Sequence, residues 1–267
     1  YDETLFIPIK TGKFIDGAFS QDGGIYPGTN YMLIGDPGIG KTTVCLDVLL
    51  HAMLAGKKVL FISAEMNKID MYGYAQRIKG FGDIPTLYLS DYTDHDTREV
   101  IAKTLQQGWD LVLIDSAAEV CEDLRAHGLS SKEADSWIID QMTTHNEAKN
   151  DSKTYSSFIV IQQVTKGGNF VGSNKWKHNT TGMIELRFQD DDRYAIVTKN
   201  RRGFQYDKIC FNIHANEVVY REDMYKIALH KDEMDKEAES KKEREAKLFN
   251  ELFLKNKEEQ QAGIEKT

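Results

Sequence analysis

The sequence predicts an α/β fold: a mainly parallel, twisted sheet flanked by helices, with an antiparallel hairpin at one edge and a charged helical tail. Three observations support this prediction. Short apolar runs alternate with longer helical patterns up to about residue 165, which is typical of βαβ units. Two alternating runs then flank a polar turn, which is typical of a hairpin. The last 47 residues hold 11 Lys or Arg and 13 Asp or Glu, which indicates a solvated helix.

The parallel part of the sheet is predicted from short apolar runs, which are too short for helices and are bounded by turn residues. Helical patterns with apolar residues three or four positions apart lie between these runs. The expected strands are 31–34, 58–63, 86–89, 111–114 and 157–162, and the expected helices are 41–55, 69–80, 96–107 and 132–148.

The edge hairpin is expected from residues 184–188 and 194–198, because both alternate and only five polar residues separate them. Residues 208–213 should add a further strand. The domain boundary is placed where the composition shifts, so that residues 1–220 form the core and residues 221–267 the tail.

Composition excludes several classes of protein. With 34 Lys+Arg against 42 Asp+Glu the net charge is −8, so a nucleic acid could be met only by a local basic patch. The three cysteines, Cys45, Cys121 and Cys210, lack the spacing of a zinc site or a disulfide framework. No apolar run approaches the roughly 18 residues of a membrane span. We therefore expect a cytoplasmic protein with no membrane partner.

A phosphate-binding loop is the clearest motif in the chain. Residues 35–42 read GDPGIGKT and match GxxxxGK[ST], directly after a strand and before a helix. Backbone N–H groups and the helix N-terminus should surround the phosphates of ATP, with Lys41 between the β- and γ-phosphates and Thr42 on Mg²⁺. The expected nucleotide-binding residues are Gly35, Asp36, Pro37, Gly38, Ile39, Gly40, Lys41, Thr42 and Thr43.

Two carboxylates are candidates to complete a triphosphate site. Asp115 ends the buried strand 111–114 and is expected to hold Mg²⁺ together with Thr42; the alternative is a cap of the next segment. Glu65 follows the strand 58–63 and is expected to activate the attacking water. Its alternative role is an acid at a helix N-terminus, where it would interact with the helix dipole.

These motifs together resemble the RecA-type ATPases, and within them the bacterial RadA (Sms) recombination proteins, over roughly residues 10 to 215. The last matching motif reads KNRRG and resembles the KNRFG motif of RadA, with Arg202 in place of Phe. Residues 63–66, which read SAEM, and Gln163 also resemble motifs of hexameric DnaB-type helicases. The matching segments are 23–28, 33–42, 59–65, 112–116, 164–166 and 199–203.

The departures from these families matter as well. RadA carries an N-terminal four-cysteine zinc finger and a C-terminal protease-like domain, and DnaB carries an N-terminal helical domain; none of these is found in this sequence. What the resemblance leaves is a minimal core with a charged tail, a form that is common in phages.

The resemblance implies further site residues. Gln163 would sense the γ-phosphate, and Lys199 and Arg201 would act in trans on the ATP of an adjacent subunit in a hexameric ring or a filament. From the residues alone, the cations at 199–202 are equally a solvated edge that discourages strand pairing.

A glycine-rich, basic segment follows the sensor position and is a candidate DNA-binding loop. Lysines there would contact phosphates and aromatics would stack on the bases of a single strand. The alternative is an active-site lid whose aromatics pack on the core. A second loop, 126–132, lies where the family has its other DNA loop. The candidate DNA-binding residues are Lys166, Gly167, Gly168, Phe170, Lys175, Trp176 and Lys177.

Three functions stay open at this point. The first is a RadA-like, DNA-stimulated ATPase acting on single-stranded or branched DNA in recombination, repair or branch migration. The second is a DnaB-like replicative helicase. The third is a nucleotide-switched regulatory ATPase of the KaiC kind, which acts without DNA.

Overall fold

The computed structural model describes residues 3–162, 174–189, 192–203 and 208–222, together with Ser240, Lys242 and Arg244. Contacts divide the chain into two units, Tyr1–Glu222 and Asp223–Thr267. The placement of a separate domain at 221–267 stays a prediction.

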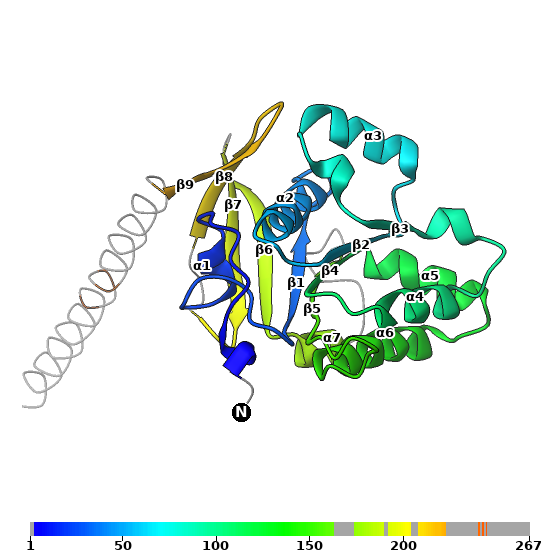
Figure 1. Ribbon diagram of the computed structural model, residues 1–267. Coiled ribbons are helices and arrows are strands. Elements are labelled where there is room, and N and C mark those ends of the chain that lie inside the picture. Colours follow the sequence, from blue (N-terminus) through cyan, green and yellow to red (C-terminus); the bar gives the residue numbers. More distant parts are fainter. Residues whose placement is uncertain are drawn as a thin grey trace, which may run out of the picture. The chain divides into compact units, whose positions relative to one another are not determined.

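The described residues of the first unit form a nine-stranded sheet in the order β3-β2-β4-β5-β1-β6-β7-β8-β9 (Figure 1). The strands from β3 to β6 pair in parallel and those from β6 to β9 pair antiparallel, which confirms the predicted mixed sheet with its edge hairpin. The strands are β1 (Asn30–Gly35), β2 (Val59–Ser63), β3 (Thr86–Tyr88), β4 (Leu111–Asp115), β5 (Ser157–Ile161), β6 (Gly182–Gln189), β7 (Asp192–Asn200), β8 (Lys208–Ile213) and β9 (Val218–Arg221).

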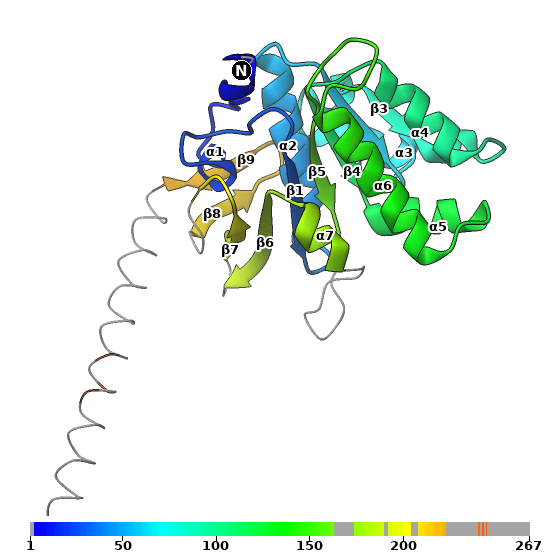
Figure 2. The same cartoon turned by 90° about the horizontal axis from the view of Figure 1, so that it is seen from below.

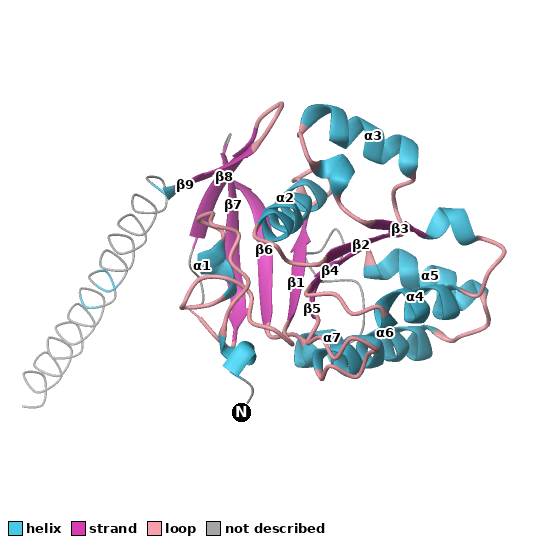
Figure 3. Ribbon diagram, in the orientation of Figure 1, coloured by secondary structure: helices cyan, strands magenta, loops and turns pink. Residues whose placement is uncertain are grey.

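Helices cover both faces of the sheet, as Figure 3 shows by colour. The helices are α1 (Asp16–Phe19), α2 (Lys41–Leu54), α3 (Lys68–Arg77), α4 (Thr97–Gln106), α5 (Ala117–Ala126), α6 (Ser131–Asn146) and α7 (Asn174–Asn179). Three short 3₁₀ turns, Glu3–Phe6, Phe81–Asp83 and Leu89–Tyr92, complete the described elements.

Successive side chains along the central strands point to opposite faces of the sheet. Leu33 and Ile159 line a small internal space together with Val44 and Val48 of α2. Their neighbours Met32 and Phe158 face the opposite side, in a buried cluster with α4, α5 and α6. Figure 2 shows α2 and α6 on these opposite faces. Because both faces of the parallel strands are covered, the strands read as continuous apolar runs rather than alternating ones.

Local capping explains where several helices begin. In α3 the Asn67 side chain accepts hydrogen bonds from the backbone N–H groups of Ile69 and Asp70, and the Asp70 carboxylate accepts from the N–H of Asn67. The same reciprocal box joins Ser130 and Glu133 at the start of α6.

Three elements differ from the sequence prediction. Helix α5 fills residues 117–126, where no helix is expected, and the second candidate DNA loop, 126–132, is largely the link 127–130 between α5 and α6. Helix α7 lies inside the segment predicted to be a loop, and β9 extends the antiparallel edge. Across the described residues, no helix is both long and apolar enough to cross a membrane.

The sheet brings three chemistry-bearing strand ends to one edge. Ser63 at the end of β2 is in register with Asp115 at the end of β4, and Gly35 ends β1 on the other side of β5. In parallel sheets ligands bind at the carboxyl ends of the strands, so this edge is where a site is expected.

Candidate active site

The phosphate-binding loop links β1 to α2 and runs close to two other strands. A Cβ added at Gly35 would lie 2.6 Å from the backbone carbonyl oxygen of Leu186 in β6. Gly40, the residue before α2, has a φ of +104°, and a Cβ there would collide with Cδ1 of Ile213 at the end of β8. Only glycine allows both the left-handed backbone and this approach. The glycines at positions 35 and 40 are therefore required by close contacts with β6 and β8 as well as by the local conformation of the loop.

Lys41 is held over this loop by backbone oxygens. Its Nζ donates hydrogen bonds to the carbonyl oxygens of Gly35 at 2.8 Å and Asp36 at 3.0 Å. Burial lowers the pKa of Lys41, while the nearby carboxylates of Asp115 and Glu65 act in the opposite direction. An ammonium that is partly desolvated in this way gains most from a phosphate arriving at the same place.

Asp115 and Thr42 form the second part of the site. The Thr42 hydroxyl donates a hydrogen bond of 2.6 Å to Oδ2 of Asp115, whose side chain is buried. The other oxygen, Oδ1, is buried and has no hydrogen-bond partner among the described residues. Buried polar atoms are normally paired. An oxygen donor left open beside a hydroxyl fits Mg²⁺, which binds carboxylates and phosphate oxygens and keeps several waters.

The pKa of Asp115 is raised to about 6: burial, the largest cause, and the charge of Glu65 raise it, and the Thr42 hydrogen bond and Lys41 lower it. Below that pH the carboxyl group gains a proton and loses the charge that attracts a cation. We expect the Kd for Mg²⁺ in nucleotide binding to rise by up to about tenfold per pH unit below pH 6. Magnesium titrations of bound fluorescent ATP between pH 5 and pH 8 measure this.

ATP itself takes up a proton in the same range, so the matched control is Asp115→Asn, which leaves the nucleotide's titration unchanged. The pH dependence of this variant should be shallower than that of the wild-type protein. Parallel pH profiles for the two proteins would contradict a metal role for Asp115.

Glu65 stands beside Asp115, just after β2. The backbone N–H groups of Ala64 and Glu65 donate to the carbonyl oxygen of Asp115 at 2.8 and 3.3 Å, which ties the two segments together. The N-terminus of α3 is capped by Asn67 and Asp70 rather than by Glu65. The Glu65 side chain is exposed and lines the cavity next to the phosphate-binding loop. That Glu65 orients the attacking water stays a prediction, and its place in this cavity supports it.

A cavity of about 610 Å³ is lined by Lys41, Thr42, Glu65 and Asp115 together with ten other residues. Six of its residues are not among the site residues expected from the sequence: two from α3, one from β7, one at the end of β8 and two from the β8–β9 turn. These six are Tyr74, Arg77, Arg193, Ile213, His214 and Ala215. The remaining lining residues are Pro37, Gly38, Gly40, Lys41, Thr42, Thr43, Glu65 and Asp115.

The sheet order gives the cavity two ends. Asp115 ends β4 and Glu65 follows β2, and both strands lie on one side of β1, whereas Arg193 and the β8–β9 turn lie on the other side. Arg193 places its guanidinium 5.2 Å from the centre of the Phe188 ring, and its Nε is buried with no hydrogen-bond partner among the described residues. The carboxylates mark the end for a terminal phosphate, so a nucleoside would extend toward the β8–β9 turn.

Lys199 and Arg201 lie at the opposite edge of the sheet. Asn200, between them, pairs with Gly182 beside Tyr31 near the start of β1, whereas the phosphate-binding loop leaves its end. Lys199 Nζ donates to the carbonyl oxygens of Lys177 and Thr180 at the end of α7, the latter at 2.7 Å. Arg201 donates to the carbonyl oxygen of His178 at 2.8 Å. Neither side chain lines the ATP cavity of its own subunit.

The prediction that Trp176 stacks on DNA is wrong. Its side chain is 0% exposed, and its Nε1 donates a hydrogen bond of 2.9 Å to Asp135 in α6. The ring anchors α7 to α6, so it is unavailable to a base. Lys175 and Lys177 are exposed, with Lys175 donating to Ser136 at 2.9 Å. The other candidates, Gln163, Lys166, Gly167, Gly168 and Phe170, lie outside the described residues.

A phosphate-binding loop at the carboxyl edge of this sheet, with a hydroxyl–carboxylate pair beside it, defines a P-loop ATPase of the RecA type. The family comparison agrees: residues 9–172 match the family described as "ATPase: KaiC". The chain belongs to this KaiC family of ATPases.

Curated relatives include the DNA repair protein RadA of Mycobacterium tuberculosis, 28% identical over 198 residues, which cover 73% of this chain and 39% of that protein. RadA of Campylobacter jejuni is 25% identical over 207 residues, covering 76% of this chain and 44% of that protein. The chain thus spans about two fifths of the length of these relatives.

Two solved structures share the fold. A KaiC-like protein from Pyrococcus horikoshii has a TM-score of 0.60 at 17% identity, covering 80% of this chain and 99% of that one. The RadB recombinase has a TM-score of 0.58 at 20% identity, covering 79% and 98%. The RecA-like core predicted from the sequence is confirmed.

Proposed function

We propose that this protein is a Mg²⁺-dependent ATPase that acts on single-stranded DNA in recombination or repair and assembles so that neighbouring subunits share each ATP site. The observation that carries the ATPase part is the Thr42–Asp115 pair beside Lys41, with one buried Asp115 oxygen left open. Thr42 and Asp115 would hold Mg²⁺, Lys41 would bind the β- and γ-phosphates, and Glu65 would orient the attacking water. Bound Mg²⁺ would neutralise charge on the phosphates.

The shared site is supported by the position of Arg201. Its guanidinium lies at the sheet edge opposite the phosphate-binding loop, so it could reach an ATP only on another copy of the chain. One hydrogen bond to the His178 carbonyl uses one of the five N–H donors of a guanidinium. The side chain is exposed, which leaves it accessible to a neighbouring subunit.

The DNA part of the proposal is supported by the RadA relatives, whose names describe DNA repair, and by the exposed Lys175 and Lys177. A second candidate is a nucleotide-switched regulator without DNA. The match to the KaiC family and the burial of Trp176 favour it.

The ATPase rate with and without single-stranded DNA separates the two candidates. If DNA is the partner, we expect the rate to rise several-fold, and DNA binding to weaken steeply as salt increases because lysine–phosphate contacts release counterions. A rate unchanged by DNA, together with no salt-sensitive binding, would instead favour the switch.

Lysine substitutions test the same surface. Replacing both Lys175 and Lys177 with alanine should reduce the stimulation by DNA, since each removes a phosphate contact. Lys103→Ala is the matched control, because Lys103 is an exposed lysine on α4, outside the surface formed by α7. Equal losses in the double variant and the control would contradict a DNA contact at α7.

A further inference from the structure

The β8–β9 hairpin contacts the nucleotide cavity with its turn. Phe211 pairs with Tyr220 and Ile213 with Val218, and the turn is closed by a hydrogen bond of 2.9 Å from the His214 N–H to the Glu217 carbonyl oxygen. Ile213, His214 and Ala215 line the end of the cavity assigned to the nucleoside. Ile213 also fills the space above Gly40 in the phosphate-binding loop.

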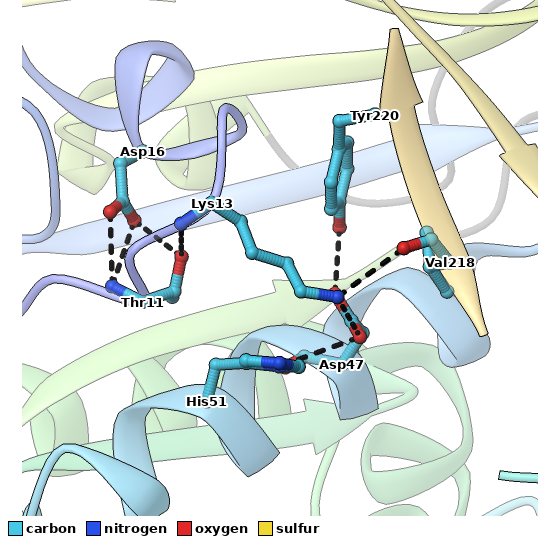
Figure 4. A network of polar contacts seen from close by, with 7 residues as sticks. All are labelled: Thr11, Lys13, Asp16, Asp47, His51, Val218 and Tyr220. Carbon is cyan, nitrogen blue, oxygen red and sulfur yellow. Dashed lines mark hydrogen bonds and ion pairs between the residues drawn. The ribbon is translucent and has the colours of Figure 1, made fainter.

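The other end of the hairpin is fixed by a buried carboxylate. Asp47, in α2, is 1% exposed and accepts two hydrogen bonds, one on each oxygen (Figure 4). Lys13 Nζ lies 2.9 Å from Oδ1, and the Tyr220 hydroxyl lies 3.2 Å from Oδ2. Lys13 also donates to the carbonyl oxygen of Val218 at 3.3 Å, and His51 Nδ1 lies 3.5 Å from the carboxylate.

Lys13 reaches this point from an ordered N-terminal turn. The Asp16 carboxylate accepts hydrogen bonds from the backbone N–H and the hydroxyl of Thr11 and from the N–H of Gly12, at 2.8 to 3.1 Å. The N–H of Lys13 donates to the Thr11 hydroxyl at 3.1 Å. Asp47 therefore joins three segments: the N-terminal turn, the helix that follows the phosphate-binding loop, and the last strand of the sheet.

The Tyr220 hydroxyl is a dependable donor in this arrangement. Burial raises the pKa of Tyr220 well above its usual value, and the neighbouring Asp47 raises it further. The hydroxyl therefore keeps its proton across the working pH range. Its acceptor is ionic, and hydrogen bonds to charged groups are among the stronger ones in proteins.

We infer that Tyr220 is a positioning residue for nucleotide binding: anchored on Asp47, it holds the β8–β9 turn against the phosphate-binding loop and so preforms the surface that the nucleoside end of ATP meets. The inference rests on the proposed function, in which ATP occupies this cavity. Tyr220 itself does not line the cavity.

The two ends of ATP should respond differently when the β8–β9 turn is loosened. The phosphates would be bound by backbone N–H groups of the phosphate-binding loop, by Lys41 and by Mg²⁺; the hairpin supplies none of these groups, and it contacts the loop only through Ile213 at Gly40 among the described residues. If the hairpin turn is in place only part of the time, the apparent Kd for ATP rises by the inverse of that fraction, while a ligand without a nucleoside is unaffected.

The experiment compares ATP with inorganic tripolyphosphate, each with Mg²⁺, by isothermal titration calorimetry on the full chain. Tyr220→Phe should weaken ATP binding roughly tenfold, in line with the loss of a hydrogen bond to a charged group, and leave tripolyphosphate within about twofold. Tyr31→Phe is the matched control, since it removes the hydrogen bond of another tyrosine hydroxyl in the same sheet, at 2.6 Å to the carbonyl oxygen of Phe19 in α1. This control should leave the ratio of the two affinities unchanged.

Equal weakening of both ligands in folded Tyr220→Phe, or no change in either, would overturn the inference. If that variant fails to fold, Lys13→Gln provides the second test, because it weakens the same anchor while leaving the Tyr220–Asp47 hydrogen bond; the ATP-selective loss should then be smaller and in the same direction, and an unselective loss would again overturn the inference. A wild-type protein that binds neither ligand would overturn the proposed function instead.

Discussion

Replacing Lys41 with alanine is expected to lower kcat for ATP hydrolysis by about a thousandfold or more, because the variant loses the ammonium that stabilises charge between the β- and γ-phosphates. Lys41 Nζ is held by the carbonyl oxygens of Gly35 and Asp36, at the position where phosphates would enter. Steady-state ATPase assays with saturating Mg²⁺ measure the loss.

The control for this variant is Lys79→Ala, which removes an exposed lysine just after α3 that does not line the cavity. It should keep wild-type turnover. Wild-type turnover in Lys41→Ala would mean that the phosphate-binding loop has been assigned wrongly.

Mixing Lys41→Ala subunits with Arg201→Ala subunits should restore activity that neither variant has alone. An Arg201→Ala subunit keeps its own ATP site, and a Lys41→Ala neighbour can supply the missing guanidinium in trans. With random mixing at equal amounts, about a quarter of the junctions combine an intact ATP site with an intact cation, so about a quarter of wild-type activity is expected.

The matched control mixes Lys41→Ala with the double variant Lys41→Ala/Arg201→Ala, in which no junction has an intact ATP site. That mixture should stay inactive. If the first mixture is no more active than the sum of its two components, the ATP site is not shared through Arg201.

The parts of the fold that depend on local pattern could be predicted from the sequence. The GxxxxGK[ST] motif places a strand before it and a helix after it, and a carboxylate that ends a buried apolar run, as Asp115 does, meets that loop in any parallel sheet of this order. Helix α5 was missed although it carried a usable signal: Ala117, Val120 and Leu124 are buried at helical spacing.

The features of the fold and the site that could not be predicted depend on contacts between distant parts of the chain. Trp176 lies in a polar, glycine-rich stretch, and its partner Asp135 is 41 residues away, so its burial could not be seen locally. Tyr220 and Asp47 are 173 residues apart. Arg193 reaches the cavity only because β6 and β7 pair in the observed register, which a local pattern does not specify.

Specific ATPase activity as a function of protein concentration, measured with Mg²⁺ and single-stranded DNA, tests the shared ATP site most directly. Subunits that complete one another's sites should have low activity per subunit when dilute, and activity should rise steeply over the range in which light scattering shows assembly. Fast turnover per subunit that stays constant down to concentrations where only monomers are present would contradict the account.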